Sequence, residues 1–206
     1  YAWFDFTPES LDWHCRVARE VWKRYGHHRS FYGWYISEEV FGDLNRGTKT
    51  PEEIVAFFRG FGKLRDELDP TLPVMLAPNC FGVPSALDSW KLLARELDIL
   101  CPFGFNRMPE GDLAPEQAIA LMQSIADENG AHLWLDMEIF LFKEDMALYP
   151  RPVDEIFYEL ENYRSFEKVL CYQFPGLLNA PGSRLTPGGP DTVKLYCDYR
   201  RRIHAD

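Results

Sequence analysis

The sequence predicts an α/β protein built as a (β/α)8 barrel of the TIM type. Short segments rich in aromatic and β-branched residues alternate along the chain with longer segments that begin and end like helices. Because no predicted strand follows another directly, successive strands should run parallel and be joined by crossover helices. An open, doubly wound sheet usually has a Gly-rich turn after its first strand, and none occurs here. We therefore expect a closed barrel, with residues 1–206 forming a single domain.

Six strands are predicted, each followed by a helix. The strands cover residues 1–6, 31–37, 73–77, 98–105, 131–138 and 168–174, and the helices about 8–25, 51–68, 85–97, 115–129, 153–163 and 191–203. Thr7-Pro8-Glu9 and Thr50-Pro51-Glu52 each combine an N-cap residue, a proline and an acidic residue, which favour a helix start. A long irregular loop is expected between residues 138 and 150. A barrel needs eight strands, so two should lie before Tyr1, and the chain would be the C-terminal three quarters of the barrel.

Composition and charge narrow the classes of function. The chain is 46% hydrophobic and 26% charged, as expected of a globular protein. Its net charge is −10 and its 22 Lys and Arg residues are spread along the chain, which argues against nucleic acid as a partner. No apolar segment is long enough for a membrane span.

Cysteine and histidine spacing gives no sign of a metal site. The five cysteines lack any zinc-type spacing, and the five histidines show no metal-ligand pattern. We therefore expect neither a metal nor another cofactor. The odd number of cysteines leaves at least one thiol unpaired within the chain, which favours a reducing compartment.

The strand over residues 131–138 separates two kinds of side chain by parity. Its apolar, helix-facing set is Leu133, Leu135 and Met137. Trp134, Asp136 and Glu138 should then point toward the barrel axis, with polarity increasing toward the C-terminal end. Because unpaired carboxylates are costly to bury, two acids on one face indicate either a functional site or a buried ion pair with an Arg or Lys of a neighbouring strand.

The same reasoning selects polar residues at the ends of other strands. In residues 31–39, Trp34 and Ile36 share a parity with Glu38, so Glu38 should face the helices and Glu39 the barrel axis. The other candidates for inward-facing polar groups are Asp5, Asn79, Asn106 and Gln173. Structural alternatives stand beside these readings. Glu39 could be the N-terminal acid of the next helix, and the two asparagines could cap loops.

If the last predicted strand is the eighth, Glu39 and Glu138 lie at the C-terminal ends of strands four and seven. This placement resembles the clan of retaining barrel glycosidases, in which strand four carries the acid/base and strand seven the nucleophile. Such chemistry needs one carboxyl that is protonated, to donate to the leaving oxygen, and one that is ionised, to attack the sugar. The resemblance therefore implies Glu39 as acid/base and Glu138 as nucleophile.

Several motifs also resemble a bacterial family, domain of unknown function 4434, which is grouped with glycoside-hydrolase-like barrels. The motifs are FYGWYISEE (31–39), DILCP (98–102), HLWLDMEIF (132–140) and LYCDY near Leu195. The family's GWY motif is followed by a Glu that corresponds to Glu39, and its strand-seven acid corresponds to Glu138. After DILCP the family usually shows a Gln-Asp-Gly-like run, whereas this chain has FGFN (103–106).

The leading hypothesis is thus a glycosidase-like enzyme that binds a carbohydrate or another small polar ligand. The candidate hydroxyl-binding groups are Asp5, Asn79, Asn106, Asp136 and Gln173, and the candidate stacking surfaces are Tyr35 and Trp134. A non-catalytic carbohydrate-binding barrel is the first alternative, because the family has no settled activity. A metal-assisted hydrolase that uses Asp136, Glu138 and a histidine is the second.

Overall fold

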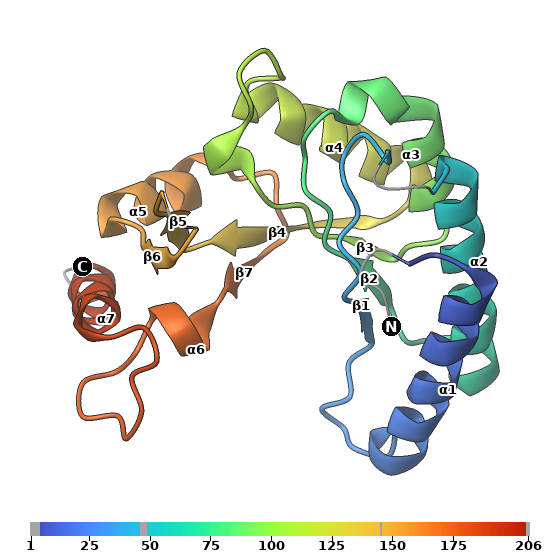
Figure 1. Cartoon of the computed structure of the whole chain (residues 1–206), viewed down its shortest axis with the longest axis horizontal. Helices are drawn as coiled ribbons and strands as arrows, with labels where there is room; N and C mark the ends of the chain where they lie inside the picture. Colours follow the sequence, from blue (N-terminus) through green and yellow to red (C-terminus); the bar gives the residue numbers. More distant parts are fainter. Residues whose placement is uncertain (1–4, 46–48, 145, 205–206) are drawn as a thin grey trace. The chain divides into compact units, whose positions relative to one another are not determined.

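The computed structural model describes residues 5–45, 49–144 and 146–204, except for the side chain of Pro175. Most of the strand predicted over residues 1–6 lies outside the described residues. The chain divides into two compact units, Tyr1–Trp134 and Leu135–Asp206, called unit 1 and unit 2 below (Figure 1).

Unit 1 alternates helices and strands. In chain order it contains α1 (Pro8–Tyr25), β1 (Trp34–Ile36), α2 (Pro51–Leu68), β2 (Val74–Leu76), α3 (Leu87–Ala94), β3 (Ile99–Leu100), α4 (Pro115–Asn129) and the start of β4 (His132–Glu138). The strands lie in the order β1-β2-β3-β4, and each adjacent pair is parallel. The predicted α/β arrangement of parallel strands joined by helices is therefore confirmed (Figure 1).

The two Thr-Pro-Glu triplets begin helices as predicted. The Thr7 hydroxyl accepts a hydrogen bond from the Ser10 amide at 3.2 Å. Thr50 and Glu53 form a reciprocal capping box, because the Glu53 amide donates to the Thr50 hydroxyl and the Thr50 amide donates to the Glu53 carboxylate. These bonds satisfy amides that the first turn of a helix leaves without partners.

The core of unit 1 forms where α2 and α3 meet one face of the sheet. Trp34 and Ile36 are the buried residues of β1. The Trp34 ring meets that of Phe61 in α2 edge to face, with centroids 6.0 Å apart. Side chains that are almost fully buried include Phe57, Phe58, Phe61, Trp90 and Leu93. Burial of this many large apolar groups supplies the main favourable term in the folding of unit 1.

The sheet of unit 1 is strongly curved. β1 and β4 are separated by β2 and β3, so a flat sheet would hold them about 14 Å apart. The ring of Tyr32, just before β1, nevertheless stacks on that of Trp134 in β4, with centroids 6.0 Å apart. An aromatic side chain that directly precedes β1 therefore meets one of β4, although these two strands are not neighbours, as happens inside a barrel. Completion of this curved sheet to eight strands stays a prediction.

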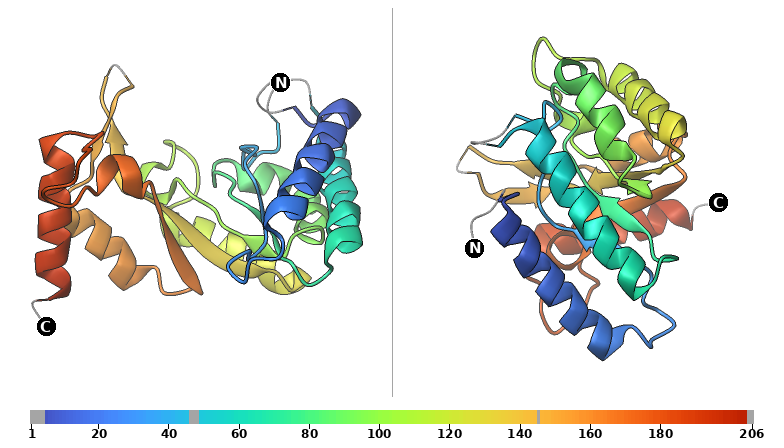
Figure 2. Two further views of the ribbon diagram at one scale, coloured as in Figure 1. Left: turned by 90° about the horizontal axis from the view of Figure 1, so that it is seen from below. Right: turned by 90° about the vertical axis from the view of Figure 1, so that its right-hand side faces the viewer.

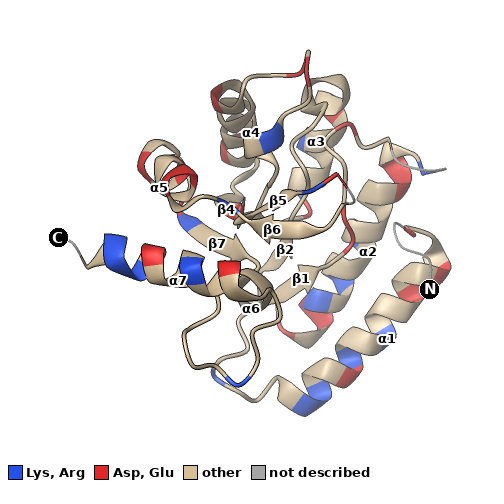
Figure 3. Cartoon of the chain, turned by 60° about the vertical axis from the view of Figure 1, so that its left-hand side comes forward, with Lys and Arg blue, Asp and Glu red and all other residues tan. Residues whose placement is uncertain are grey.

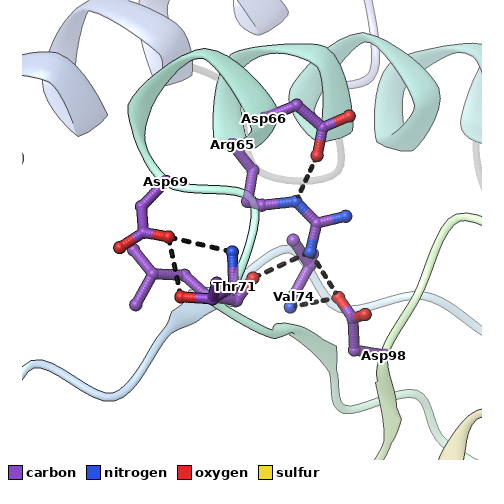
Figure 4. Close-up of polar contacts among 7 residues, drawn as sticks. Arg65, Asp66, Asp69, Thr71, Val74 and Asp98 are labelled. Carbon is purple, nitrogen blue, oxygen red and sulfur yellow. Dashed lines mark hydrogen bonds and ion pairs between the residues drawn. The ribbon is translucent and has the colours of Figure 1, made fainter.

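A polar network fixes the N-terminal ends of β2 and β3 to the end of α2 (Figure 4). Arg65 Nη1 donates to the Leu72 carbonyl at 2.7 Å and to Asp98 Oδ2 at 2.8 Å. The same oxygen of Asp98 accepts a hydrogen bond from the Val74 amide at 2.8 Å. In barrel folds, groups at the N-terminal ends of strands serve stability, whereas active sites lie at the C-terminal ends. We therefore assign this network to stability.

Unit 2 contains the end of β4, a hairpin, three helices and one further strand. These are β5 (Phe140–Phe142), β6 (Leu148–Pro150), α5 (Val153–Asn162), β7 (Lys168–Tyr172), α6 (Phe174–Leu177) and α7 (Pro190–Ile203). β7 is the neighbour of β4 in the sheet, and the Ile139 amide donates to the Tyr172 carbonyl at 3.0 Å.

The β5–β6 hairpin replaces the irregular loop predicted between residues 138 and 150 (Figure 2). Phe140 pairs with Pro150 and Phe142 with Leu148 in antiparallel register. The turn includes Met146 with φ +64°, a left-handed conformation that few residues other than glycine adopt. The prediction that no strand follows another directly was wrong here, because a three-residue strand carries too little alternation to be recognised.

The strands β1, β2 and β3 and the helix α3 of unit 1 are shorter than predicted, and the difference has a clear physical cause in two of them. β3 ends at Leu100 and not at residue 105, since Pro102 has no amide hydrogen to donate and Gly104, with φ +94°, turns the chain into a 3₁₀ turn over Phe105–Arg107. The helix predicted from residue 85 begins as a 3₁₀ turn, Val83–Ala86, before α3.

Charged residues of both signs occur on α1, α2, α3 and α7 (Figure 3). On α7, Lys194 and Arg201 both pair with Asp198. Basic residues there are thus matched locally by acids, in keeping with the scatter of basic residues along the sequence. All five cysteines are free thiols. Within the described residues, no helix has the length and apolar character needed to cross a membrane.

Candidate functional site

The end of β1 places two adjacent glutamates in different surroundings. Glu38 is only 1% exposed, and its carboxylate lies 3.6 Å from His14 Nε2 of α1. Glu39 is half-buried, and Tyr35, which shares its parity, is 54% exposed. Glu38 therefore faces the helices and Glu39 the opposite side, as the alternation of side chains predicts.

The segment after Glu39 is held by hydrogen bonds to neighbouring loops. The Asn79 amide donates to the Val40 carbonyl at 3.1 Å. Asn79 Oδ1 accepts from the amides of Gly42 at 3.2 Å and Phe81 at 3.1 Å, and Trp90 Nε1 donates to the Gly42 carbonyl at 2.6 Å. Asn79 is buried, so it caps these loops and fixes the segment that carries Glu39.

Asn106 has a donor that the protein leaves unused. Among the buried side-chain nitrogen and oxygen atoms of the described residues, only Asn106 Nδ2 and Trp34 Nε1 lack a hydrogen-bond partner. An unmade hydrogen bond of this kind is expensive. Asn106 follows β3 at its C-terminal end, where an acceptor on a ligand would satisfy the amide.

Asp5 is engaged in the start of α1. Its Oδ1 accepts a hydrogen bond from the Thr7 amide at 3.0 Å and lies 4.0 Å from Lys49 Nζ. The hydrogen bonds to Thr7 lower the pKa of Asp5, and the nearby Lys49 charge adds to this effect. Asp5 is therefore ionised at neutral pH and has a local structural role beside the predicted contact with a ligand.

The aromatic surface of unit 1 includes a residue that the sequence did not single out. Trp134 was predicted as a stacking surface for a ligand. Its side chain is only 7% exposed, because the ring of Tyr32 stacks on it. Tyr32 itself is 60% exposed. The accessible aromatic groups of this part of unit 1 are thus Tyr32 and Tyr35. An aromatic residue just before a strand, in FYGWY, was the available signal.

In unit 2, Asp136 and Glu138 share one face of β4 at its C-terminal end. Glu138 is 5% exposed and Asp136 is half-buried. Desolvation raises the pKa of Asp136 from 3.8 to about 7, and repulsion from the Glu138 charge acts in the same direction. Asp136 therefore keeps its proton to a much higher pH than an exposed aspartate does, beside a second carboxyl group.

A buried arginine, Arg151, contacts the main chain next to these acids; the sequence patterns did not predict it. Arg151 follows β6 and donates from Nη1 to the Glu138 carbonyl oxygen at 2.8 Å. It also pairs with Glu159 at 3.1 Å and with Glu155 at 3.4 Å, both on α5. The sequence allows Asp136 and Glu138 to form a buried ion pair with an Arg or Lys of a neighbouring strand. In the structure, the Arg151 guanidinium donates to the main-chain carbonyl of Glu138, and the carboxylates that pair with Arg151 belong to Glu155 and Glu159 on α5.

β7 contributes the remaining candidate. Gln173 follows directly after β7 and is joined to Tyr172 by a cis peptide bond. Partial desolvation, and then the charge of Asp136, raise the pKa of the Cys171 thiol. Cys171 therefore lies near Asp136, and Gln173 follows Cys171 by two residues. Within the described residues, no group of three His, Cys, Asp or Glu side chains is arranged to hold a metal ion.

A family model described as "Domain of unknown function (DUF4434)" matches residues 8–185. The chain belongs to the DUF4434 family. The match runs from the first residue of α1 to beyond α6. It covers parts of both units, with every candidate residue except Asp5, and ends before α7. The resemblance predicted from the sequence motifs is therefore confirmed.

Solved structures similar to this DUF4434 chain include a "putative alpha-L-fucosidase" from Bacteroides thetaiotaomicron VPI-5482. That structure gives a TM-score of 0.69 at 22% identity, over 95% of this chain and 63% of the other. The likeness establishes a common fold, and the DUF4434 chain spans less than two thirds of that protein's length. A GH18 chitinase from Pseudoalteromonas aurantia gives a TM-score of 0.39 at 14% identity, over 59% of this chain and 47% of the other, too low to indicate a common fold. No curated protein matches the chain.

Proposed function

We propose that the chain is a glycosidase-like enzyme that cleaves a glycosidic bond, with Glu138 as nucleophile and Glu39 as general acid/base. The observation that carries this proposal is the carboxyl pair at the end of β4. Glu138 is buried there beside Asp136, whose pKa is raised to about 7. A buried carboxyl group beside one whose pKa is raised is typical of sites that use carboxyl groups in catalysis. Glu39 enters the proposal through its orientation at the end of β1, opposite to that of Glu38.

The proposed mechanism has two steps. Glu39 donates a proton to the leaving oxygen while the ionised Glu138 carboxylate attacks the anomeric carbon, which breaks the glycosidic bond and forms a glycosyl ester. Glu39, now ionised, takes a proton from water as that water attacks the ester, and Glu138 is released. Asp136 in its protonated form donates a hydrogen bond, either to a sugar hydroxyl or within the carboxyl pair.

The fold supports the same proposal. The family match and the fold shared with the Bacteroides protein support a barrel-like arrangement of parallel strands, and we propose that residues 1–206 belong to one such domain. The proposed sugar contacts are Asp5, Tyr35, Asn106, Asp136 and Gln173, as predicted from the sequence, with Tyr32 added. Trp134 would act from beneath Tyr32, and Asn79 through the segment that it caps. The unused Nδ2 donor of Asn106 is the strongest support among them.

The test is turnover of a panel of 4-nitrophenyl glycosides that includes the α-L-fucoside, by wild type, Glu138→Gln, Glu39→Gln and Glu38→Gln. Loss of the nucleophile should lower kcat by about 10³-fold or more. Glu39→Gln should cost less on 4-nitrophenyl glycosides than on glycosides with poorer leaving groups, because 4-nitrophenolate needs little protonation. Glu38→Gln is the matched control, since Glu38 faces His14; it should lower stability and leave kcat unchanged. Wild-type kcat in Glu138→Gln would refute the assignment.

A carbohydrate-binding protein without catalysis is the second candidate, and the exposed Tyr32 and Tyr35 with the unused Asn106 donor favour it. These groups suit the binding of a polar ring whether or not a bond is cleaved. A wild type that binds glycans on an array without turnover, together with a Glu39→Gln, Glu138→Gln double variant that binds equally well, would establish this candidate in place of the enzyme.

A further inference from the structure

The β5–β6 hairpin returns the chain to the point where β4 ends. Phe140 pairs with Pro150 at the open end of the hairpin. The next residue, Arg151, donates its amide hydrogen to the Ile139 carbonyl at 3.0 Å. The eleven residues from Phe140 to Pro150 therefore bring a basic side chain to the main chain of Glu138.

One peptide group is held from both sides at this point. Its carbonyl oxygen, that of Glu138, accepts a hydrogen bond from Arg151 Nη1 at 2.8 Å. Its amide hydrogen, that of Ile139, is donated to the Tyr172 carbonyl of β7 at 3.0 Å. Because the peptide group is planar, two bonds at its opposite ends fix its orientation and with it the ψ angle of Glu138.

The guanidinium that makes this bond is itself fixed. Arg151 is 4% exposed, and its Nη2 and Nε face Glu159 at 3.1 Å and Glu155 at 3.4 Å. These glutamates are four residues apart on α5 and therefore lie on the same face of the helix. Desolvation raises the pKa of Glu159, and the bond and charge of Arg151 oppose that rise. The planar fork of arginine can serve the carbonyl and the carboxylates together, which the single ammonium of lysine cannot.

We propose that Arg151 is a positioning residue for Glu138, which it orients by clamping the peptide group that follows. The proposal rests on the proposed function in so far as Glu138 is the nucleophile. Arg151 does not touch the reacting atoms. It acts through the main chain of Glu138, and α5 acts through Arg151. Because a nucleophile displaced by about 1 Å can cost on the order of 10²-fold in rate, such a clamp has a measurable effect on catalysis.

The test compares Arg151→Lys and Arg151→Met with Arg65→Met. Arg65 is the matched control, because it also joins carboxylates to a backbone carbonyl but does so at the N-terminal ends of strands in unit 1. Two readouts do not need a substrate: the ¹³C shift of the Glu138 carbonyl, and the hydrogen-exchange rate of the Ile139 amide. Both should change in Arg151→Met and Arg151→Lys, and neither in Arg65→Met at a temperature where every variant is folded.

The third readout is the pH profile of kcat on whichever glycoside the wild type turns over. Arg151→Lys should lower kcat by about 10²-fold with little change in KM. In Arg151→Met kcat should fall at least as far across the whole pH range, since no side-chain donor at position 151 remains for the Glu138 carbonyl. Arg65→Met should lose stability and keep the wild-type profile. If no glycoside is turned over, the proposed function fails while the first two readouts still decide the clamp. An unchanged Glu138 carbonyl shift and Ile139 exchange rate in Arg151→Met would overturn it.

Discussion

At the scale of single residues, the chemistry of this chain depends on where each carboxyl group lies. Glu38 and Glu39 are neighbours in sequence, but the alternation of a strand sends one toward His14 and the other to the opposite side. Asp136 and Glu138 lie on one face and share a desolvated environment, which raises the pKa of Asp136. Composition alone cannot distinguish these acids, whereas burial and neighbouring charge do.

The raised pKa of Asp136 makes stability depend on pH. The folded state binds this proton more tightly than the unfolded chain does, so the contribution of Asp136 to the free energy of unfolding falls as pH rises from about 4 to about 7. In Asp136→Asn that loss is absent. The stability of the variant relative to wild type should therefore increase from pH 3.5 to pH 8, by at most about 4 kcal/mol. Urea unfolding across this pH range measures it, and parallel stability curves for the two proteins would contradict the expectation.

At the scale of elements, loops and helix ends in unit 1 are fixed by polar groups that bridge sequence-distant segments. Arg65 and Asp98 tie the end of α2 to the starts of β2 and β3 (Figure 4). At the other ends of the strands, Asn79 and Trp90 hold Gly42. The first network serves stability, and the second fixes the segment that follows Glu39.

Arg65→Met should lower the free energy of unfolding by about 2 kcal/mol, because it leaves the Leu72 carbonyl and the Asp98 carboxylate without their shared donor. Arg59→Met is a control on the same helix. Arg59 forms an exposed pair with Glu96, and such pairs contribute about 0–1 kcal/mol. Chemical denaturation of both variants tests the difference. Equal losses would mean that the Arg65 network is no stronger than a surface ion pair.

Gly42→Ala should disturb the segment beside Glu39, since the added Cβ would lie 2.2 Å from the Phe81 carbonyl oxygen. We expect a loss of about 1–3 kcal/mol, as for overpacking elsewhere, together with reduced kcat. Gly62→Ala is the matched control within α2, where a Cβ meets nothing within 4 Å. It should stabilise the helix by roughly 0.5–1 kcal/mol. Thermal unfolding and turnover of both variants test this contrast, and a Gly42→Ala protein with unchanged stability would contradict the close contact.

At the scale of the whole molecule, the two units differ in how they are packed. The largest fully buried side chains all belong to unit 1, and they include Trp90, Phe57, Phe58, Met122 and Leu133. In unit 2, by contrast, four of the five residues of β7 are exposed and the fifth is half-buried. Buried apolar area is the main source of stability. The free energy of local unfolding should therefore be larger in unit 1 than in unit 2.

Native-state hydrogen exchange should therefore show the amides of β2 and β3 to be the slowest in the chain and those of β7 among the faster strand amides. Mass spectrometry of peptic fragments can resolve the two groups. Equal protection of β3 and β7 under conditions that keep the chain folded would contradict this order.

Much of the fold was predictable because its signals are local. The Thr-Pro-Glu triplets begin α1 and α2 through side-chain hydrogen bonds within three residues. In β1, buried and exposed side chains alternate as the sequence predicts. The β5–β6 hairpin was not predictable, because its three-residue strands are paired only through a turn that includes Met146 at positive φ. The 3₁₀ turn after Gly104 likewise depends on a backbone conformation that alternation does not reveal.

The sequence by itself determined the α/β class, the parallel order of strands, membership of the DUF4434 family and the parity that separates Glu39 from Glu38. Each of these depends on local propensity, period or motif. Only the tertiary structure decided that Asn79 caps loops, that Tyr32 stacks on Trp134, that the pKa of Asp136 is raised to about 7 and that Arg151 bonds the Glu138 main chain. The physical reason is that burial, charge coupling and hydrogen bonding depend on which sequence-distant groups meet, and that information is absent from any single segment.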